Sequence, residues 1–224
     1  MSSALHVFEK SPRGYLIFTS SQKWTVPAGV HKIKVLAIGG GGGGGGGYSS
    51  TYVGGGGGSG VLVFAEMIVQ PGIQLNITVG AGGSPGNGGA SPTSGGAGGA
   101  SIIMDVNNVD VYLLANGGLG GGAATSTANG SPAPSNSNSA EMTTTKVPPF
   151  LINAYTVAGA PGNGQFGGST PILAPGFASA SNLTYGWAGG TSAYSFGQGG
   201  AGGGVNANGQ AGMPGVVLIW WGDD

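Results

Sequence analysis

Nine consecutive glycines, Gly39–Gly47, follow directly on "KIKVLAI", a stretch in which lysines first alternate with apolar residues. A second run of five glycines begins at Gly54. Glycine loses more backbone freedom on folding than any other residue and has no side chain to bury. Because the nine-residue run has no internal period, we expect it to form a tight loop or a close approach between backbones.

Other glycine tracts have a period of three. In "AGGSPGNGGASPT" the residues Ala81, Ser84, Asn87, Ala90 and Thr93 are spaced by three, and most places between them are glycine. Similar spacing occurs in "GQGGAGGG" and "GQAGMPG" near the C-terminus. This spacing matches the polyproline-II helix, whose three-residue turns contain no internal hydrogen bonds. We predict that such helices pack together and bond one another, so that glycines form a core. The alternative is mobile loops on a β-scaffold.

The composition favours a folded chain. Glycine supplies 53 of the 224 residues, which by itself is typical of flexible sequences. Disordered chains, however, combine low hydrophobicity with high net charge. Here 39% of the residues are apolar, only 6% are charged, and the formal net charge is −1. We therefore expect a packed protein with an unusually backbone-rich core.

The remaining apolar stretches are typical of strands. "IQLNITV" alternates cleanly, with Leu75 and Ile77 on one face and Asn76 on the other, and no stretch has a convincing helical period. The fold class predicted is all-β: an antiparallel β-sandwich, jelly-roll-like, combined with glycine-rich polyproline-II-type segments. Strands are expected at 15–19, 32–35, 60–69, 73–79, 100–104, 109–115 and 215–221.

The domain organisation expected is a lead or attachment segment at 1–14 and a single glycine-rich β domain at 15–222. Within that domain, 123–149 is rich in Ser, Thr, Asn and Pro and has no apolar period, which favours an exposed loop. We expect the whole range 123–196 to be a variable loop insertion.

The sequence offers little catalytic chemistry. It has seven acidic residues, two histidines and no cysteine, and no acidic pair has a spacing that suggests a glycosidase. "GGSPG" at Gly82–Gly86 fits a nucleophile elbow by letter only, because no helix follows it. Lys146 is the only basic residue after Lys34, which is too few for a nucleic-acid interface. We expect no enzyme activity, no cofactor, no metal and no nucleic-acid partner.

Aromatic residues recur in stretches that we predict to be loops, and loops on a rigid scaffold commonly carry binding sites. The candidate receptor-binding residues are Trp187, Tyr185, Tyr194, Phe196, Tyr155, Phe166, Tyr48 and Tyr52, with Phe177 in the same region. Trp187, near the centre of the cluster, is the first choice, because Trp and Tyr dominate many interfaces. The alternative for each residue is that it fills a gap between glycine helices.

The opening "FTSSQKWTVPAGVHKIKVLAIGGGGGGGGG" resembles the glycine-rich domain of tailed-phage tail fibres and adhesins. "SGVLVFAEMIVQPGIQLNITVGAGG" and the ending "AGMPGVVLIWW" are similar to the same family, so that the resemblance covers about 15–122 and 197–222. It implies stacked polyglycine-II helices whose distal loops contact a host. The region from Ala123 to Phe196 departs from the family pattern, and no family binding residue is carried onto it.

The resemblance implies a non-enzymatic adhesin at the tip of a fibre, extracellular on a virion or similar fibre. Its target would be a bacterial surface glycan or an outer-membrane protein, and its partners would be a homotrimer or a trimeric shaft that it caps. Two other hypotheses remain open. One is a purely structural fibre or assembly module, and the other is an ice-binding protein, which the bulky aromatics disfavour.

Overall fold

The computed structural model describes residues 13–106, 111–135, 149–158, 161–162, 164, 167–168 and 196–222. Within these ranges the chain is all-β and contains no helix, so none that could cross a membrane. The strands are β1 (Gly14–Phe18), β2 (Gln22–Thr25), β3 (Lys32–Ile38), β4 (Leu62–Ile68), β5 (Gln74–Thr78), β6 (Ser101–Asp105), β7 (Val111–Ala115), β8 (Phe150–Val157) and β9 (Val216–Trp221).

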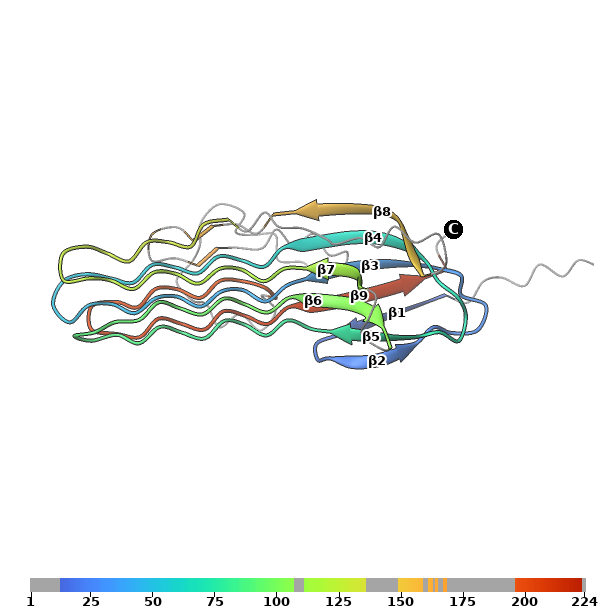
Figure 1. Cartoon of the computed structure of the whole chain (residues 1–224), viewed down its shortest axis with the longest axis horizontal. Helices are drawn as coiled ribbons and strands as arrows, with labels where there is room; N and C mark the ends of the chain where they lie inside the picture. Colours follow the sequence, from blue (N-terminus) through green and yellow to red (C-terminus); the bar gives the residue numbers. More distant parts are fainter. Residues whose placement is uncertain are drawn as a thin grey trace, which may run out of the picture.

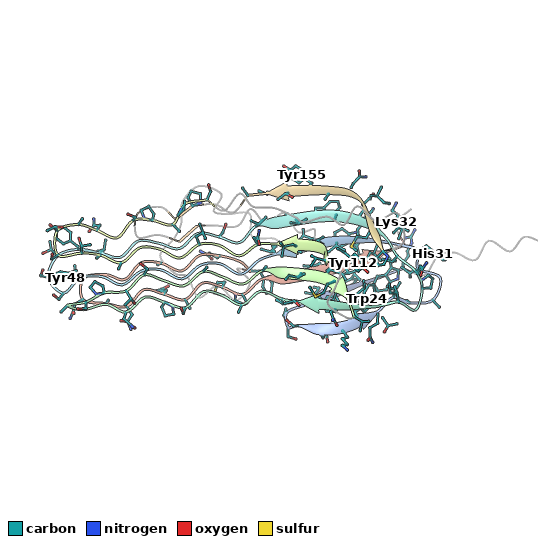
Figure 2. The ribbon with its side chains drawn as sticks, viewed as in Figure 1. Trp24, His31, Lys32, Tyr48, Tyr112 and Tyr155 are labelled. Atoms are coloured by element: carbon teal, nitrogen blue, oxygen red, sulfur yellow. The ribbon has the colours of Figure 1, made fainter. Side chains whose placement is uncertain are left out.

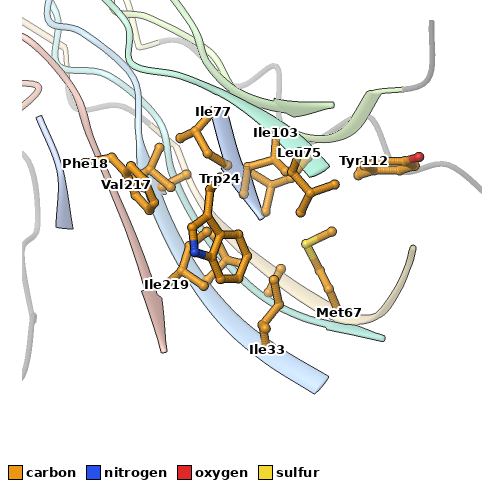
Figure 3. Close-up of a cluster of buried hydrophobic side chains, with 14 of the residues drawn as sticks. Phe18, Trp24, Ile33, Met67, Leu75, Ile77, Ile103, Tyr112, Val217 and Ile219 are labelled. Atoms are coloured by element: carbon orange, nitrogen blue, oxygen red, sulfur yellow. The ribbon is translucent and has the colours of Figure 1, made fainter. Parts of the chain in front are cut away.

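The strands form two antiparallel sheets, in the orders β1-β9-β3-β4-β8 and β2-β5-β6-β7, as the sandwich prediction requires. Alternation along each strand decides which side chains enter the core. In β3, Ile33 and Val35 are buried while Lys32 and Lys34 lie on the other face, and in β5 Leu75 and Ile77 are buried. Figure 3 shows the resulting cluster around Trp24, whose ring lies 5.8 Å from that of Trp221.

A bundle of extended glycine-rich segments continues from the strands (Figure 1). β3 runs into residues 39–47, and the chain returns through 54–61 into β4. The other long hairpins follow the same plan. From β5 the chain runs out through 80–89 and returns through 93–99 to β6. From β7 it runs out through 116–124, and near the C-terminus it runs out through 197–204 and returns through 207–213 to β9. The molecule is therefore a rod, with the two sheets at one end and the glycine bundle at the other.

Residues 39–47, here called the central segment, lie on the axis of the bundle. Every N–H in this segment donates to a carbonyl of another segment, at N···O distances of 2.8–3.0 Å. Successive acceptors rotate through three neighbours, so that Gly39, Gly42 and Gly45 donate to Val61, Gly58 and Gly55. A partner that recurs at every third residue defines a helix of three residues per turn. The two antiparallel neighbours that complete the set of acceptors are 93–99 and 207–213.

Three further neighbours run parallel to the central segment and donate to its carbonyls. From segment 116–124, Gly118 and Gly121 donate to the carbonyls of Gly40 and Gly43. In the same way, segment 80–89 donates to the carbonyls of Gly41 and Gly44, and segment 197–204 donates to those of Gly42 and Gly45. The six outer segments also bond one another, as when Gly96 donates to Ser84, so that the ring around the axis is closed. The prediction of polyproline-II-type segments that bond one another is thus confirmed.

The expectation of a close backbone approach at Gly39–Gly47 is confirmed, but the segment is not a loop. A Cβ at any of the nine positions would overlap a backbone carbonyl, in the order of segments 116–124, 80–89 and 197–204, repeated three times. All nine glycines are buried. The sequence reasoning missed this period because a run of identical residues carries no pattern, although successive residues face three different neighbours in turn.

The interpretation of 123–196 as a loop insertion is wrong for parts of the described chain. Residues 130–133 extend the bundle, since Gly130 donates to Val53 and Ala133 donates to Gly56. β8 at Phe150–Val157 adds a fifth strand to the larger sheet beside β4. β2 was also missed, because four residues, "QKWT", are too few for a periodicity argument.

We expect Gly43→Ala to destabilise the fold by about 3 kcal/mol or more, because its Cβ would overlap the backbone carbonyl of Ser84, and a backbone atom cannot rotate aside as a side chain can. The matched control is Gly204→Ala, because nothing lies within 4 Å of a Cβ at Gly204. Thermal unfolding of the two variants measures the difference. Equal melting temperatures would show that the bundle is not packed in this way.

Candidate functional site: the loop end of the glycine bundle

Four loops come together at the end of the bundle farthest from the sheets (Figure 1). They are residues 48–53, 90–92, 125–129 and 205–206, and together they are called the loop end. Each loop joins two antiparallel glycine segments. They lie at the same level because Gly46 bonds Thr93 and Ala124, while Gly47 bonds Ala207 and Gly89.

Tyr48 and Tyr52 lie at this end, and Tyr48 is labelled in Figure 2. The Tyr48 N–H donates to the Tyr52 carbonyl at 2.8 Å, and the Tyr48 carbonyl accepts from the Asn206 N–H at 2.9 Å. Both tyrosines are half-buried, and Ser49, Ser50 and Thr51 between them are exposed. The backbone therefore fixes the two tyrosines in position while part of each residue stays open to solvent.

Asparagine and threonine side chains connect the loops to their neighbours. The Val53 N–H donates to Asn129 Oδ1 at 3.0 Å, and the Gly88 N–H donates to Asn208 Oδ1 at 2.8 Å. The Asn87 N–H donates to Thr93 Oγ1 at 2.8 Å, within a single turn. The bonds of Asn129 and Asn208 join segments 76 and 120 residues apart in the sequence, whereas the bond of Thr93 closes its own hairpin.

The loop end carries no formal charge in the part of the chain that the structure describes. The same is true of the central segment and the six outer segments. The charged residues in the described ranges all lie in the strands or directly beside them: Arg13, Lys23, Lys32, Lys34, Glu66 and Asp105. The central segment alone spans roughly 28 Å at ~3.1 Å per residue. The loop end is therefore well beyond a Debye length of ~8–10 Å from these charges.

A second surface lies on the outer face of the five-stranded sheet and is called the aromatic sheet face. It consists of Tyr15, Ile17, Phe64, Tyr155 and Trp220, which register places on one side of the sheet. Tyr15 is 75% exposed and Tyr155 is 66% exposed. The rings of Phe64 and Trp220 lie 5.7 Å apart at 44°. The same register places Lys34 and Glu66 on this face, on the two strands between Trp220 and Tyr155. The face therefore offers aromatic contact area beside two charges, at the opposite end of the rod from the loops.

The predicted site residues do not form one cluster. Tyr48 and Tyr52 are together at the loop end, whereas Tyr155 was expected in a loop and instead lies in β8, opposite Phe64. Phe196 is half-buried and packs against the second apolar cluster, formed by Leu36, Ile38, Leu62 and Val216. Trp187, Tyr185, Tyr194, Phe166 and Phe177 lie outside the described residues.

Sequence reasoning missed the polar residues of the loop end and of the segments directly beside it. Asn129, Asn206 and Asn208 stand in "ANG" and "NANG", where Asn and Gly together are a turn signal that was available but not used. It also missed Tyr15 and Trp220, which belong to stretches that were interpreted only as strands. Their exposure depends on which strand lies beside them, and that is a property of the sheet.

Within the described ranges, no group of three or more His, Asp or Glu residues could hold a metal ion. The arrangement at the loop end offers hydroxyls, amides and two phenol rings, which suit recognition by hydrogen bonding and ring contact.

Comparison with known proteins identifies one family. The model of a family described as "Glycine-rich domain" matches residues 18–221, a range that begins at the last residue of β1 and contains β2 to β9 and the glycine bundle. No curated protein matches the chain.

We expect Asn206→Val to destabilise the protein by about 1–2 kcal/mol, because Asn206 has a φ of 58° and a β-branched residue is strained there. Asn206→Gly is the control, because glycine adopts this conformation without strain. Thermal unfolding measures both changes. A Val variant as stable as the Gly variant would contradict the left-handed turn.

Proposed function

This chain belongs to the glycine-rich domain family, and we propose that it is a non-enzymatic receptor-binding adhesin that presents the loop end to its target. The observation that carries the proposal is the position of the loop end. Four polar loops lie together at the tip of a rod whose axis is a glycine segment in which every N–H is hydrogen-bonded.

Rigidity is the physical advantage of such a tip. Association loses free energy when loops and side chains must be ordered at the interface. Here the loops are short, and backbone bonds to neighbouring segments hold Tyr48 and Val53 before any ligand arrives. Tyrosine adds a large, stiff contact area with a polar end. The loop end is therefore suited to binding with a small ordering cost.

The fibre-tip part of the proposal rests on the resemblance to tail-fibre adhesins together with the shape of the rod. A tip protein needs one end for the fibre and one for the target, and this molecule has two chemically different ends. We assign the loop end to a bacterial surface receptor and the sheet end to the fibre. On this proposal the protein acts outside the cell, on a virion or similar fibre.

Attachment of fluorescently labelled protein to a panel of bacterial strains tests the proposal. We expect Tyr48→Ala and Tyr52→Ala each to weaken attachment by ~10-fold or more, the usual size of an interface anchor. Both should keep the parent's melting temperature, because the bonds of Tyr48 and Tyr52 at this end are made by backbone atoms.

The matched control for attachment is Leu119→Ala, which removes a side chain that is 38% exposed on the flank of the bundle. Parent-like attachment by both folded tyrosine variants would remove the loop end as the binding site. Trp187, Tyr185 and Tyr194 would then be the next positions to change, since the sequence predicts binding there.

The aromatic sheet face favours a second function, that of a structural module whose copies pack together. We propose that this face joins the chain to other copies in a homotrimer, or to the trimeric shaft that it caps. Large exposed apolar patches mark interaction surfaces, and Tyr15, Ile17 and Tyr155 are each more than 40% exposed. The two functions are compatible because they use opposite ends.

Light scattering tests the association. We expect the parent to be a trimer at micromolar concentration and Tyr155→Glu to be a monomer, because an added charge would lose its hydration when it is buried against another copy. Thr51→Glu, an exposed change at the loop end, should remain trimeric. A parent that is monomeric at this concentration would exclude the homotrimer, and the proposal would then be limited to a single chain that caps a trimeric shaft.

A further inference from the structure

We infer that the loop end recognises an uncharged saccharide, and this inference rests on the proposed adhesin function. The starting observation is the complete absence of formal charge from the described glycine bundle and its loops. The rod holds the loop end beyond the screening distance of the charges in the sheets.

An uncharged site disfavours a charged ligand. A carboxylate or phosphate that loses water on binding needs a counter-charge or several directed hydrogen bonds. Within the described loops there is no Lys or Arg to supply either the charge or the bidentate donors that acidic groups prefer. An acidic sugar or a phosphorylated headgroup would therefore be bound less well than its neutral counterpart.

The same argument disfavours a protein receptor. About a quarter of the residues of an ordinary soluble protein are charged, and an interface with the loop end would leave those at its centre without partners. A neutral sugar ring, by contrast, offers hydroxyls that both donate and accept, together with apolar C–H faces. The observations therefore favour a glycan.

The chemical groups at the loop end match a sugar. Asn129 in the loop end, and Asn87 and Asn208 in the segments directly beside it, are exposed and have amide groups that both donate and accept, and Thr127 and Ser126 add exposed hydroxyls. The side-chain oxygens of Asn129 and Asn208 already accept hydrogen bonds from backbone N–H groups, which fixes the orientation of each amide. Tyr48 and Tyr52 supply the rings against which a sugar face packs. Segments that are far apart in the sequence thus combine to form one polar, aromatic surface.

The deciding experiment treats receptive cells in two ways before the labelled protein is added. Periodate cleaves the vicinal diols of sugars and leaves most polypeptide intact, whereas proteinase digests exposed protein loops. We expect attachment to be lost after periodate and kept after proteinase. Loss after proteinase with retention after periodate would overturn the saccharide inference and leave the adhesin function standing. Failure to attach to any strain would instead overturn the adhesin function itself.

An array of neutral and acidic oligosaccharides gives a second, independent measurement. We expect binding to neutral members only, and an affinity that changes less than ~2-fold between about 0.05 and 0.5 M NaCl, because the described loops carry no charge for salt to screen. Binding confined to acidic members, or a steep loss with salt, would overturn the inference.

Variants of the loop end locate the binding on the array. Tyr48→Ala should reduce binding by ~10-fold or more, Tyr48→Phe should keep most of it because the ring is retained, and Leu119→Ala should match the parent. If Tyr48→Ala does not fold, Tyr52→Ala provides the same comparison at the neighbouring ring. Equal binding by the parent and both alanine variants would place the saccharide site away from the loop end.

Discussion

The hydrogen bond between backbones of neighbouring glycine segments is the interaction on which the rest of the structure depends. A polyproline-II helix makes no hydrogen bonds within itself, so that each buried N–H and C=O needs a partner on another helix. An unpaired buried group costs about 1–3 kcal/mol. Around residues 39–47 each N–H is paired, and the pairing is possible only because no side chain separates the segments. The glycines that would make an isolated chain flexible are here the reason that the bundle is closed.

The apolar sandwich and the glycine bundle depend on each other. The sandwich buries ordinary apolar residues, such as Ile33, Val63, Leu75 and Ile219, and sets the register of the strands. Each long hairpin then carries that register into the bundle. Ser101 lies at the junction, where its hydroxyl donates to the Ile38 carbonyl at 2.6 Å and accepts from the Gly80 N–H at 3.0 Å. A shift of one residue in a strand would displace every threefold contact beyond it, so that the sheets position the loops at the far end.

The division of charge between the two ends follows from the same packing. Glycine segments in close contact leave outward positions only at every third residue, and those positions hold Ala81, Ser84 and Asn87 on one segment. Lysine and glutamate occur where strands have a solvent-facing side. Lys34 and Glu66 are an example, since they lie opposite each other in the register of β3 and β4. The chemistry available to a ligand therefore differs between the ends, and the saccharide and trimer proposals each follow from one of them.

The sequence by itself determined the all-β class, seven of the nine described strands, and the threefold period of the segment that contains Ala81, Ser84 and Asn87. These features are periodic, and a local pattern is enough to predict them. It also predicted that Tyr48 and Tyr52 lie in a loop and not in a strand. Only the tertiary structure decided that Gly39–Gly47 is the axis of the bundle, that Tyr155 lies on a strand, and that Asn129, Asn206 and Asn208 share one end with those tyrosines. The physical reason is that a helix without internal hydrogen bonds is defined by its neighbours, and the neighbours of the central segment come from residues as distant as Met213.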